Sequence, residues 1–196
     1  MNHGHRQGHG MFTLEEATRR SWYNPEEILT SVGLKEGMTF ADIGCGDGFF
    51  SLLATKIVGK TGKVYAVDAN AQFIEILKSR AREQNITNLY ADISQAEEYL
   101  PCHGCADIVF FSMVLHDFQD PAKVLTNARK IIKSNGLLVN LDWKKMKMDF
   151  GPPLDIRFSE HYAVTLIQNA GFKPKSNRHA GKYHYIITAK PAEPIF

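Results

Sequence analysis

Short apolar runs alternate with amphipathic segments along most of the chain. Five runs have the composition of strands buried on both faces, and they lie at residues 39–43, 63–68, 88–93, 106–112 and 136–142. Between these runs, apolar residues recur every three or four positions, which predicts helices that pack on the strands. Strands that alternate with helices in this way predict an α/β fold with a largely parallel sheet.

Two further strands are predicted near the end of the chain. Residues 172–180 and 182–189 flank Gly181, and the second segment has large apolar side chains at alternate positions from Tyr183 to Ile187. This alternation is typical of a strand, and the glycine between the segments is typical of a hairpin. The sheet is therefore predicted to have seven strands, mostly parallel, with helices on both faces and a C-terminal antiparallel hairpin.

The helices are expected to begin at polar residues whose side chains accept hydrogen bonds from the first helical turn. Such residues precede four of the amphipathic segments, at Asn24, Asn70, Asp120 and Ser159. The helix after Asp120 is predicted to include Ile132 and to end at Asn135–Gly136, because glycine ends helices readily.

The beginning of the chain differs in composition from the rest. Residues 1–10 are rich in glycine and hold His3, His5 and His9. We predict a flexible tail there, with metal binding by the histidines as the alternative. Residues 11–196 are predicted to form a single domain that opens with a helical arm at 11–33.

A glycine-rich turn follows the first predicted strand, which Asp42 closes. Gly44, Gly46 and Gly48 stand at alternate positions, where the backbone can turn sharply and a ligand can approach without a Cβ in the way. Such a turn between a strand and a helix is the usual nucleotide crevice of an open α/β sheet.

The spacing of these glycines argues against a dinucleotide. The dinucleotide fingerprint is G-x-G-x-x-G, and Phe49 stands where its third glycine belongs. The carboxylates of Asp42 and Asp47 would also repel a pyrophosphate. They suit a ligand with cationic groups, such as a sulfonium and an α-ammonium.

Acidic residues also end the second and third predicted strands. Asp68 is placed to accept hydrogen bonds from two ribose hydroxyls, and Ala69 and Asn70 follow it, where the edge of an adenine would pass. Asp92 suits the amine of adenine, with Ile93 beside the ring. The alternative for Asp92 is a helix cap for the segment that begins at Ser94.

The stretch from Asp42 to Gly48 resembles the first motif of the class I S-adenosylmethionine-dependent methyltransferases, and the acids at three strand ends match that family in order and spacing. The segment from Ser112 to Pro121, with His116, resembles the ubiquinone/menaquinone-biosynthesis-like branch. The resemblance covers nearly the whole chain from Thr39. It implies a Rossmann-like sheet and direct displacement of a methyl group from S-adenosylmethionine onto a small-molecule acceptor, with S-adenosylhomocysteine as product.

The resemblance also implies roles for particular residues. The cofactor would be held by the glycine turn and the strand ends: Asp42, Gly44, Cys45, Gly46, Gly48, Asp68, Ala69, Asn70, Asp92, Ile93 and Ser112. His116 or Asp117 would orient or deprotonate the acceptor, with a capping role as the alternative for His116. Met113, Trp22 and Tyr23 are candidates for the substrate side, and the alternative for the last two is that they anchor the arm to the core.

The cysteines raise a second possibility. Cys102 and Cys105 form a C-x-x-C pair ahead of the strand at 106–112, a spacing found in redox and metal sites. No second ligand pair accompanies them, so we predict no metal site. The odd total of three cysteines does not suggest a disulfide framework and predicts a reduced, cytoplasmic protein.

Composition narrows the class of protein. The chain has 196 residues, 44% of them hydrophobic and 22% charged, which is ordinary for one soluble domain. A net charge of +2 predicts no nucleic-acid partner, and no membrane span or signal peptide is expected. A nicotinamide-dependent oxidoreductase, or a module that handles metals or thiols, stays as the alternative. The acceptor and the oligomeric state stay open.

Overall fold

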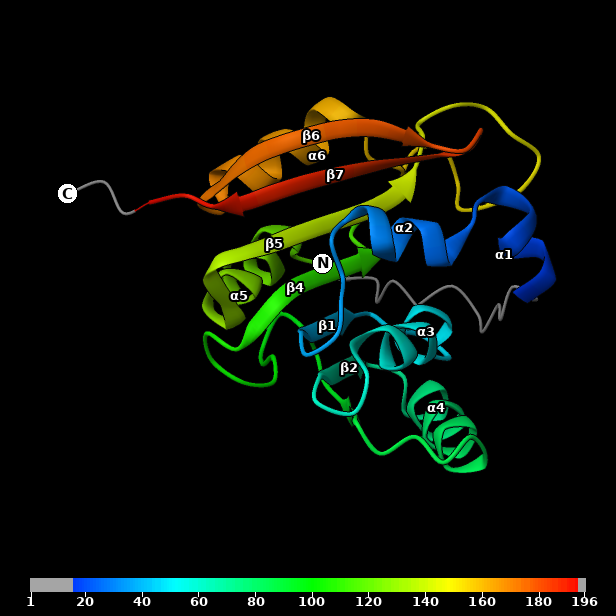
Figure 1. The fold of residues 1–196 in the computed structure, drawn as a ribbon. Helices are drawn as coiled ribbons and strands as arrows, with labels where there is room; N and C mark the ends of the chain where they lie inside the picture. The colour runs from blue at the N-terminus through cyan, green and yellow to red at the C-terminus, as the bar shows by residue number, and fades with distance from the viewer. Residues whose placement is uncertain (1–15, 194–196) are drawn as a thin grey trace, which may run out of the picture.

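The computed structural model describes residues 16–193, and the predicted tail at 1–10 lies outside this range (Figure 1). The strands are β1 Thr39–Ile43, β2 Lys63–Asp68, β3 Leu89–Ile93, β4 Ala106–Ser112, β5 Ile132–Trp143, β6 Phe172–Ala180 and β7 His184–Pro191. The helices are α1 Glu16–Trp22, α2 Pro25–Ser31, α3 Phe49–Val58, α4 Ala71–Glu83, α5 Pro121–Ile131 and α6 Glu160–Asn169.

The strands form one seven-stranded sheet in the order β3-β2-β1-β4-β5-β7-β6. The pairs β1–β2, β2–β3, β1–β4 and β4–β5 are parallel, whereas β7 runs antiparallel to both β5 and β6. The prediction of a mostly parallel sheet with a C-terminal antiparallel hairpin is confirmed. As a result, the carboxyl ends of β1, β2, β4 and β5 lie along the same edge of the sheet.

Helices cover both faces of the sheet. On one face, Ala41 and Ile43 of β1 are buried together with apolar residues of α5 and α6. On the other face, Phe40 of the same strand is buried with residues of α2 and α3. Neighbouring residues of a strand point to opposite faces, so burial of both faces explains the continuous apolar runs in the sequence.

The predicted helix caps are confirmed, and one boundary is wrong. Asn24, Asn70, Asp120 and Ser159 each accept a backbone hydrogen bond at the start of a helix. The predicted extension of the helix through Ile132 does not occur, because α5 ends at Ile131 and β5 begins at Ile132. An apolar side chain at position 132 suits a helix as well as a strand. Ile132 belongs to the strand because it pairs with Ala106 of β4.

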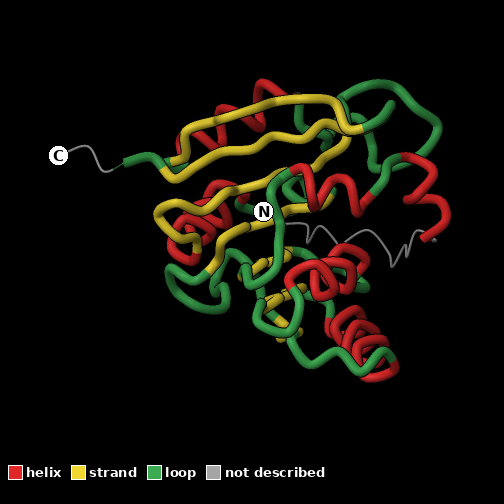
Figure 2. Tube along the Cα trace, viewed as in Figure 1, coloured by secondary structure: helices red, strands yellow, loops and turns green. Residues whose placement is uncertain are grey.

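The crossover from β3 to β4, residues 94–105, contains no helix (Figure 2), so the helix considered after Ser94 does not form. Two buried side chains, Ala96 and Leu100, pack this segment on the sheet. The Asn127 side chain of α5 donates hydrogen bonds of 2.9 Å to the carbonyls of Ala96 and Glu97. A loop pinned by side chains therefore covers the sheet where the other parallel crossovers carry a helix.

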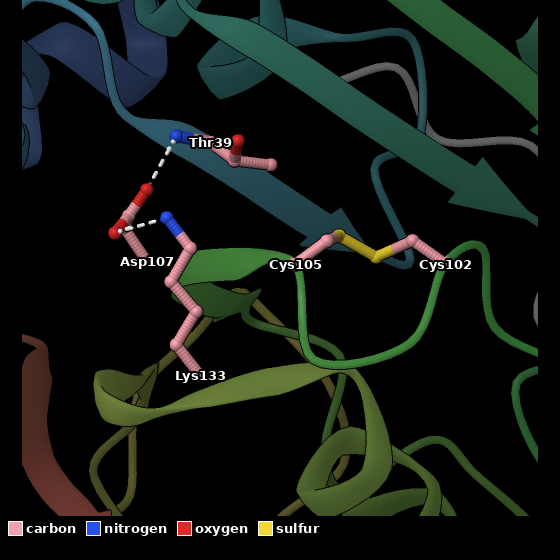
Figure 3. Close-up of a disulfide and its surroundings, with 5 residues drawn as sticks. All are labelled: Thr39, Cys102, Cys105, Asp107 and Lys133. Carbon is pink, nitrogen blue, oxygen red and sulfur yellow. Dashed lines mark hydrogen bonds and ion pairs between the residues drawn. A yellow bond between two sulfur atoms is a disulfide. The ribbon is translucent and has the colours of Figure 1, made fainter.

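Cys102 and Cys105 are joined in a disulfide within this crossover (Figure 3). The expectation of reduced cysteines is wrong for this pair, because a turn with positive φ at Cys102 and Gly104 brings the sulfurs together. The bond lies beside the start of β4, near Asp107, whose carboxylate accepts hydrogen bonds from Thr39 N (2.8 Å) and Lys133 Nζ (2.7 Å). The disulfide therefore lies at the edge of the sheet where β4 begins, opposite the carboxyl ends of the strands where the site is predicted.

The glycine turn gives a test of the fold. Gly48 and Gly33 both have a φ of 88°, which costs a residue with a Cβ about 1–2 kcal/mol. A Cβ at Gly48 would collide with Leu77 of α4, whereas nothing lies within 4 Å of one at Gly33. We expect Gly33→Ala to lower the free energy of unfolding by about 1 kcal/mol and Gly48→Ala by at least twice as much. Urea unfolding measures both, and equal losses would show that the contact with Leu77 is unimportant.

Candidate active site

A cavity of about 580 Å³ lies at the carboxyl ends of the parallel strands, which is the expected place for a ligand in such a sheet. It is lined by the turn after β1, the ends of β2 and β4, and the segments that follow β4 and β5. Ten of the residues predicted from the sequence line it: Asp42, Gly44, Cys45, Gly46, Asp68, Asn70, Ser112, Met113, His116 and Asp117.

The turn after β1 is fixed by hydrogen bonds to β2. The N–H groups of Gly44 and Cys45 both donate to the carbonyl of Val67, at 2.8 and 3.0 Å. The Asp68 carboxylate accepts hydrogen bonds of 2.8 Å from the N–H groups of Gly46 and Asn70. Burial raises the pKa of Asp68. Its carboxylate therefore organises the two loops between which a ligand would lie.

Asp42 is buried with an unused hydrogen-bond acceptor. It is 1% exposed, and its Oδ2 accepts a hydrogen bond of 2.6 Å from Ser51. Its Oδ1 has no hydrogen-bond partner among residues 16–193. Burial raises the pKa of Asp42 to about 7. A cationic donor in the cavity would satisfy this oxygen and stabilise the charged form.

Asp47 is paired with two arginines, unlike Asp42. Its carboxylate lies 2.9 Å from Arg80 Nη1 and 3.6 Å from Arg19 Nη1. The Arg19 guanidinium also lies 5.0 Å from the centre of the Phe49 ring. These contacts join α1 and α4 to the glycine turn, so Asp47 contributes less to cation binding than its place in the sequence suggests.

A buried histidine–carboxylate pair stands on the other side of the cavity. His116 Nδ1 lies 2.7 Å from Oδ1 of Asp142, and each side chain is 1% exposed. His116 Nε2 lies 3.4 Å from Asp117 Oδ1. Burial opposes a charge on the imidazole, but the carboxylates of Asp142 and Asp117 outweigh it, so the pKa of His116 is raised.

Apolar groups also line this cavity. Trp143 and residues 150–153 line the same cavity as His116. Trp22 does not line it but stacks on Phe150 with ring centres 5.4 Å apart, and Tyr23 Oη lies 3.9 Å from Met113 Sδ. These two aromatic residues of the arm therefore support the wall of the cavity from behind.

Four predicted cofactor residues do not line the cavity: Gly48, Ala69, Asp92 and Ile93. Asp92 is exposed, and its Oδ1 accepts a hydrogen bond of 2.9 Å from Ile93 N. Strand register places Ile93 beside Asp68, so both residues lie at the same sheet edge as the cavity. Their contact with adenine stays a prediction.

Sequence reasoning missed several residues of the site. Arg19, Phe73, Val114 and the wall formed by Trp143 and residues 150–153 carry no sequence motif. Asp142 had a usable signal, because it lies one residue before the end of its strand, as Asp42 does. Cys45, the free cysteine, lines the cavity, and burial raises the pKa of its thiol well above the usual value; its contact with a cofactor stays a prediction.

Comparison with known proteins identifies the family. Residues 34–157 match the family described as a methyltransferase domain. The chain belongs to this family. The structure of a SAM-dependent methyltransferase from Aquifex aeolicus is similar to this methyltransferase domain at 30% sequence identity, with a TM-score of 0.84 over 88% of this chain and 92% of that one.

Curated relatives agree with this assignment. A ubiquinone/menaquinone biosynthesis C-methyltransferase from Haemophilus ducreyi is 28% identical over 60% of this chain and 46% of its own length. A demethylmenaquinone methyltransferase from Staphylococcus aureus is 25% identical over 71% and 54%. The chain thus spans about half the length of these relatives. The predicted membership of the class I S-adenosylmethionine-dependent methyltransferases is confirmed, and these relatives are named for the branch that the sequence resembles.

Two further findings concern the alternatives. Within residues 16–193, no group of three or more His, Cys, Asp or Glu side chains could hold a metal ion, and His3, His5 and His9 lie outside this range. None of the described helices is long and apolar enough to cross a membrane.

A [4+2]-cyclase shares the fold at 13% identity with a TM-score of 0.73, so the fold alone does not give the reaction.

The buried pair at His116 gives a test of the site. We expect Asp142→Asn to lower the pKa of His116, because the carboxylate that favours the charged imidazole is lost. The pKa of His116 is raised on folding from 6.5. The stability that the pair contributes is therefore complete below pH 6.5 and lost as the pH rises through the raised value.

Histidine NMR titration measures the pKa, and urea unfolding at acid and alkaline pH measures the stability. Asp117→Asn serves as the control, because Asp117 is farther from the imidazole than Asp142 is. An unchanged titration of His116 in Asp142→Asn would contradict the ion pair.

Proposed function

We propose that this protein transfers the methyl group of S-adenosylmethionine to a small, flat, largely apolar acceptor. One observation carries the proposal. A single cavity joins the glycine turn and the unsatisfied Asp42 oxygen on one side to the His116–Asp142 pair on the other. This arrangement offers a place for a cationic cosubstrate next to a base.

The residues of the cavity fit the donor. Asp42 Oδ1 would accept from the α-ammonium, and Arg19 would hold the carboxylate. Asp68 retains lone pairs for the ribose hydroxyls, and Gly44 and Gly46 leave the backbone open to a ligand. S-Adenosylmethionine, when bound, supplies a methyl group that its sulfonium already activates. The protein's contribution is then to position the reactants and exclude water.

His116 is suited to remove a proton from the acceptor. Asp142 holds Nδ1, so in the neutral ring the lone pair lies on Nε2, 3.4 Å from Asp117 Oδ1, and can accept a proton. The carboxylates that raise the pKa of His116 also stabilise the imidazolium that forms. Proton transfer by a placed histidine contributes about 10²–10⁴ to the rate.

The wall of the cavity supports the acceptor class. Trp143, Phe150 and the two prolines at 152–153 offer flat apolar surfaces. Relatives of this chain are named for methyl transfer in quinone biosynthesis, which also favours a ring-shaped acceptor. A ring that carries a hydroxyl would place its proton near His116. A nicotinamide-dependent oxidoreductase is not favoured, because the glycine spacing and Asp42 disfavour a pyrophosphate.

Calorimetric titration with S-adenosylmethionine, S-adenosylhomocysteine and NAD tests the donor. We expect micromolar binding of the first two and none of NAD. Because a cation binds best to the ionised form of Asp42, whose pKa is about 7, affinity for the first two should fall about eightfold from pH 7.5 to pH 6.

Asp42→Asn is the control for this pH dependence, since its binding should be weaker and nearly independent of pH over the same range. Binding of NAD alone would overturn the proposed function. A wild-type affinity that does not change with pH would remove Asp42 from the cation site.

A panel of small aromatic acceptors tests the role of His116. The panel contains 1,4-naphthohydroquinone, phenol and a nitrophenol that is ionised at pH 8, with formation of S-adenosylhomocysteine as the readout. We expect His116→Gln to reduce turnover of protonated acceptors at least about a hundredfold. An acceptor that is already ionised should lose less than about tenfold, because it needs no base. Equal losses for both kinds would contradict proton removal by His116.

A further inference from the structure

The segment between β5 and α6 covers one side of the cavity. We call residues 144–156 the roof. Phe150, Gly151, Pro152 and Pro153 of the roof line the cavity next to Trp143. Figure 1 shows this segment arching beyond the carboxyl end of β5, close to α1. The shape of the space around an acceptor therefore depends on what holds the roof in place.

A buried arginine holds the middle of the roof, while its first residue, Lys144, donates a backbone hydrogen bond of 2.8 Å to the carbonyl of Tyr183. Arg157 is 3% exposed, and its guanidinium donates three hydrogen bonds to roof carbonyls. Nε donates to Pro152 O (2.7 Å), Nη1 to Met146 O (3.0 Å) and Nη2 to Phe150 O (2.9 Å). Two of these three carbonyls belong to residues that line the cavity. The planar guanidinium thus fixes the path of the backbone from residue 146 to residue 152.

The guanidinium and the roof stabilise each other. Burial of Arg157 opposes its charge and lowers its pKa, so the charged group needs every polar contact it makes. The carbonyls satisfy its donors, and the Trp143 ring lies 5.7 Å from it, within the range of a cation–π interaction. A roof that moved away would remove three hydrogen-bond partners from the guanidinium.

Close packing connects the roof to the N-terminal arm. Phe150 lies nearly parallel to Trp22, at an angle of 11°, and Trp22 meets Trp143 edge-on with ring centres 5.1 Å apart. A Cβ at Gly151 would lie 3.2 Å from Trp143 and 3.3 Å from Arg157, so only glycine fits there without displacement. Stacking of Phe150 on Trp22 therefore ties the roof to the arm, although most other residues of the roof are exposed.

We propose that Arg157 is the positioning residue that builds the acceptor half of the cavity. By holding Phe150 and Pro152 in place beside Trp143, it sets the width of the space in front of His116 and thereby selects the acceptors that fit. The inference rests on the proposed function for what the cavity binds. The order of the roof can be measured without any ligand.

Arg157→Lys tests the proposal. Lysine keeps the charge but donates from a single atom, which cannot reach three carbonyls along the segment. We expect trypsin to cleave the variant after Lys144, Lys145 and Lys147 of the roof at least about tenfold faster than wild type. Trp22 and Trp143 are the two tryptophans of the chain, so quenching of intrinsic fluorescence by acrylamide should increase at least about twofold.

A matched control separates this role from general stability. Arg129→Lys changes an arginine that donates to the Ala192 carbonyl, away from the cavity, and should leave both readouts unchanged. In Arg157→Ala, millimolar guanidinium should restore resistance to trypsin, because it can occupy the space and the hydrogen bonds of the lost group. Unchanged protection of the roof in Arg157→Lys would overturn the proposal, as would equal acceleration of cleavage at lysines throughout the chain.

Affinity for S-adenosylmethionine provides the link to function. In Arg157→Lys the affinity for S-adenosylmethionine should stay within about threefold of wild type. The reason is that Asp42 and Asp68 are held by hydrogen bonds from Ser51 and Gly46, outside the roof. A large loss would show that Arg157 serves the whole cavity and would contradict an acceptor-specific role. If wild type itself fails to bind S-adenosylmethionine, the proposed function fails while the trypsin and fluorescence results still judge the role of Arg157 in the roof.

Discussion

The carboxylate of Asp68 connects the two strand ends on which the candidate site depends. Its oxygens accept hydrogen bonds from Gly46 and Asn70, so one side chain fixes both the turn after β1 and the start of α4. Hydrogen bonds to a charged acceptor are stronger than those between neutral groups. Together with the bonds from Gly44 and Cys45 to the Val67 carbonyl, this connection fixes the path of the glycine turn.

A second polar contact organises the opposite side of the cavity. His116 follows β4, and Asp142 lies one residue before the end of the adjacent strand β5; their side chains meet in a buried pair. Buried charges are stable in proteins when they are paired and hydrogen-bonded, and Asp142 also accepts from the N–H of Trp143. The pair therefore orients the imidazole and, through the backbone of Trp143, fixes the beginning of the apolar wall.

The sequence was most informative where chemistry follows directly from strand order. Asp42, Asp68 and His116 were predictable because the ends of parallel strands meet at one edge, and the glycine spacing marks the turn. The pairing of Asp47 with Arg19 and Arg80 was not predictable, because it depends on where α1 and α4 pack. The wall formed by Trp143 and residues 150–153 was not predictable either, because Phe150 contacts Trp22 of the arm, more than a hundred positions away in the sequence. The boundary at Ile132 failed because an apolar side chain suits both a helix and a strand.

Because β7 runs antiparallel to β5, it determines at which edge of the sheet a surface or a fusion partner can be linked to the chain. Trp143 pairs with His184 near the start of β7, and Leu138 pairs with Ala189 near its end. The chain therefore leaves the sheet after Pro191 at the edge opposite the cavity. A surface or a fusion partner linked after Pro191 would leave the mouth of the cavity facing outward. The same linkage ahead of α1 would instead lie next to the helix that carries Arg19, a residue that lines the cavity.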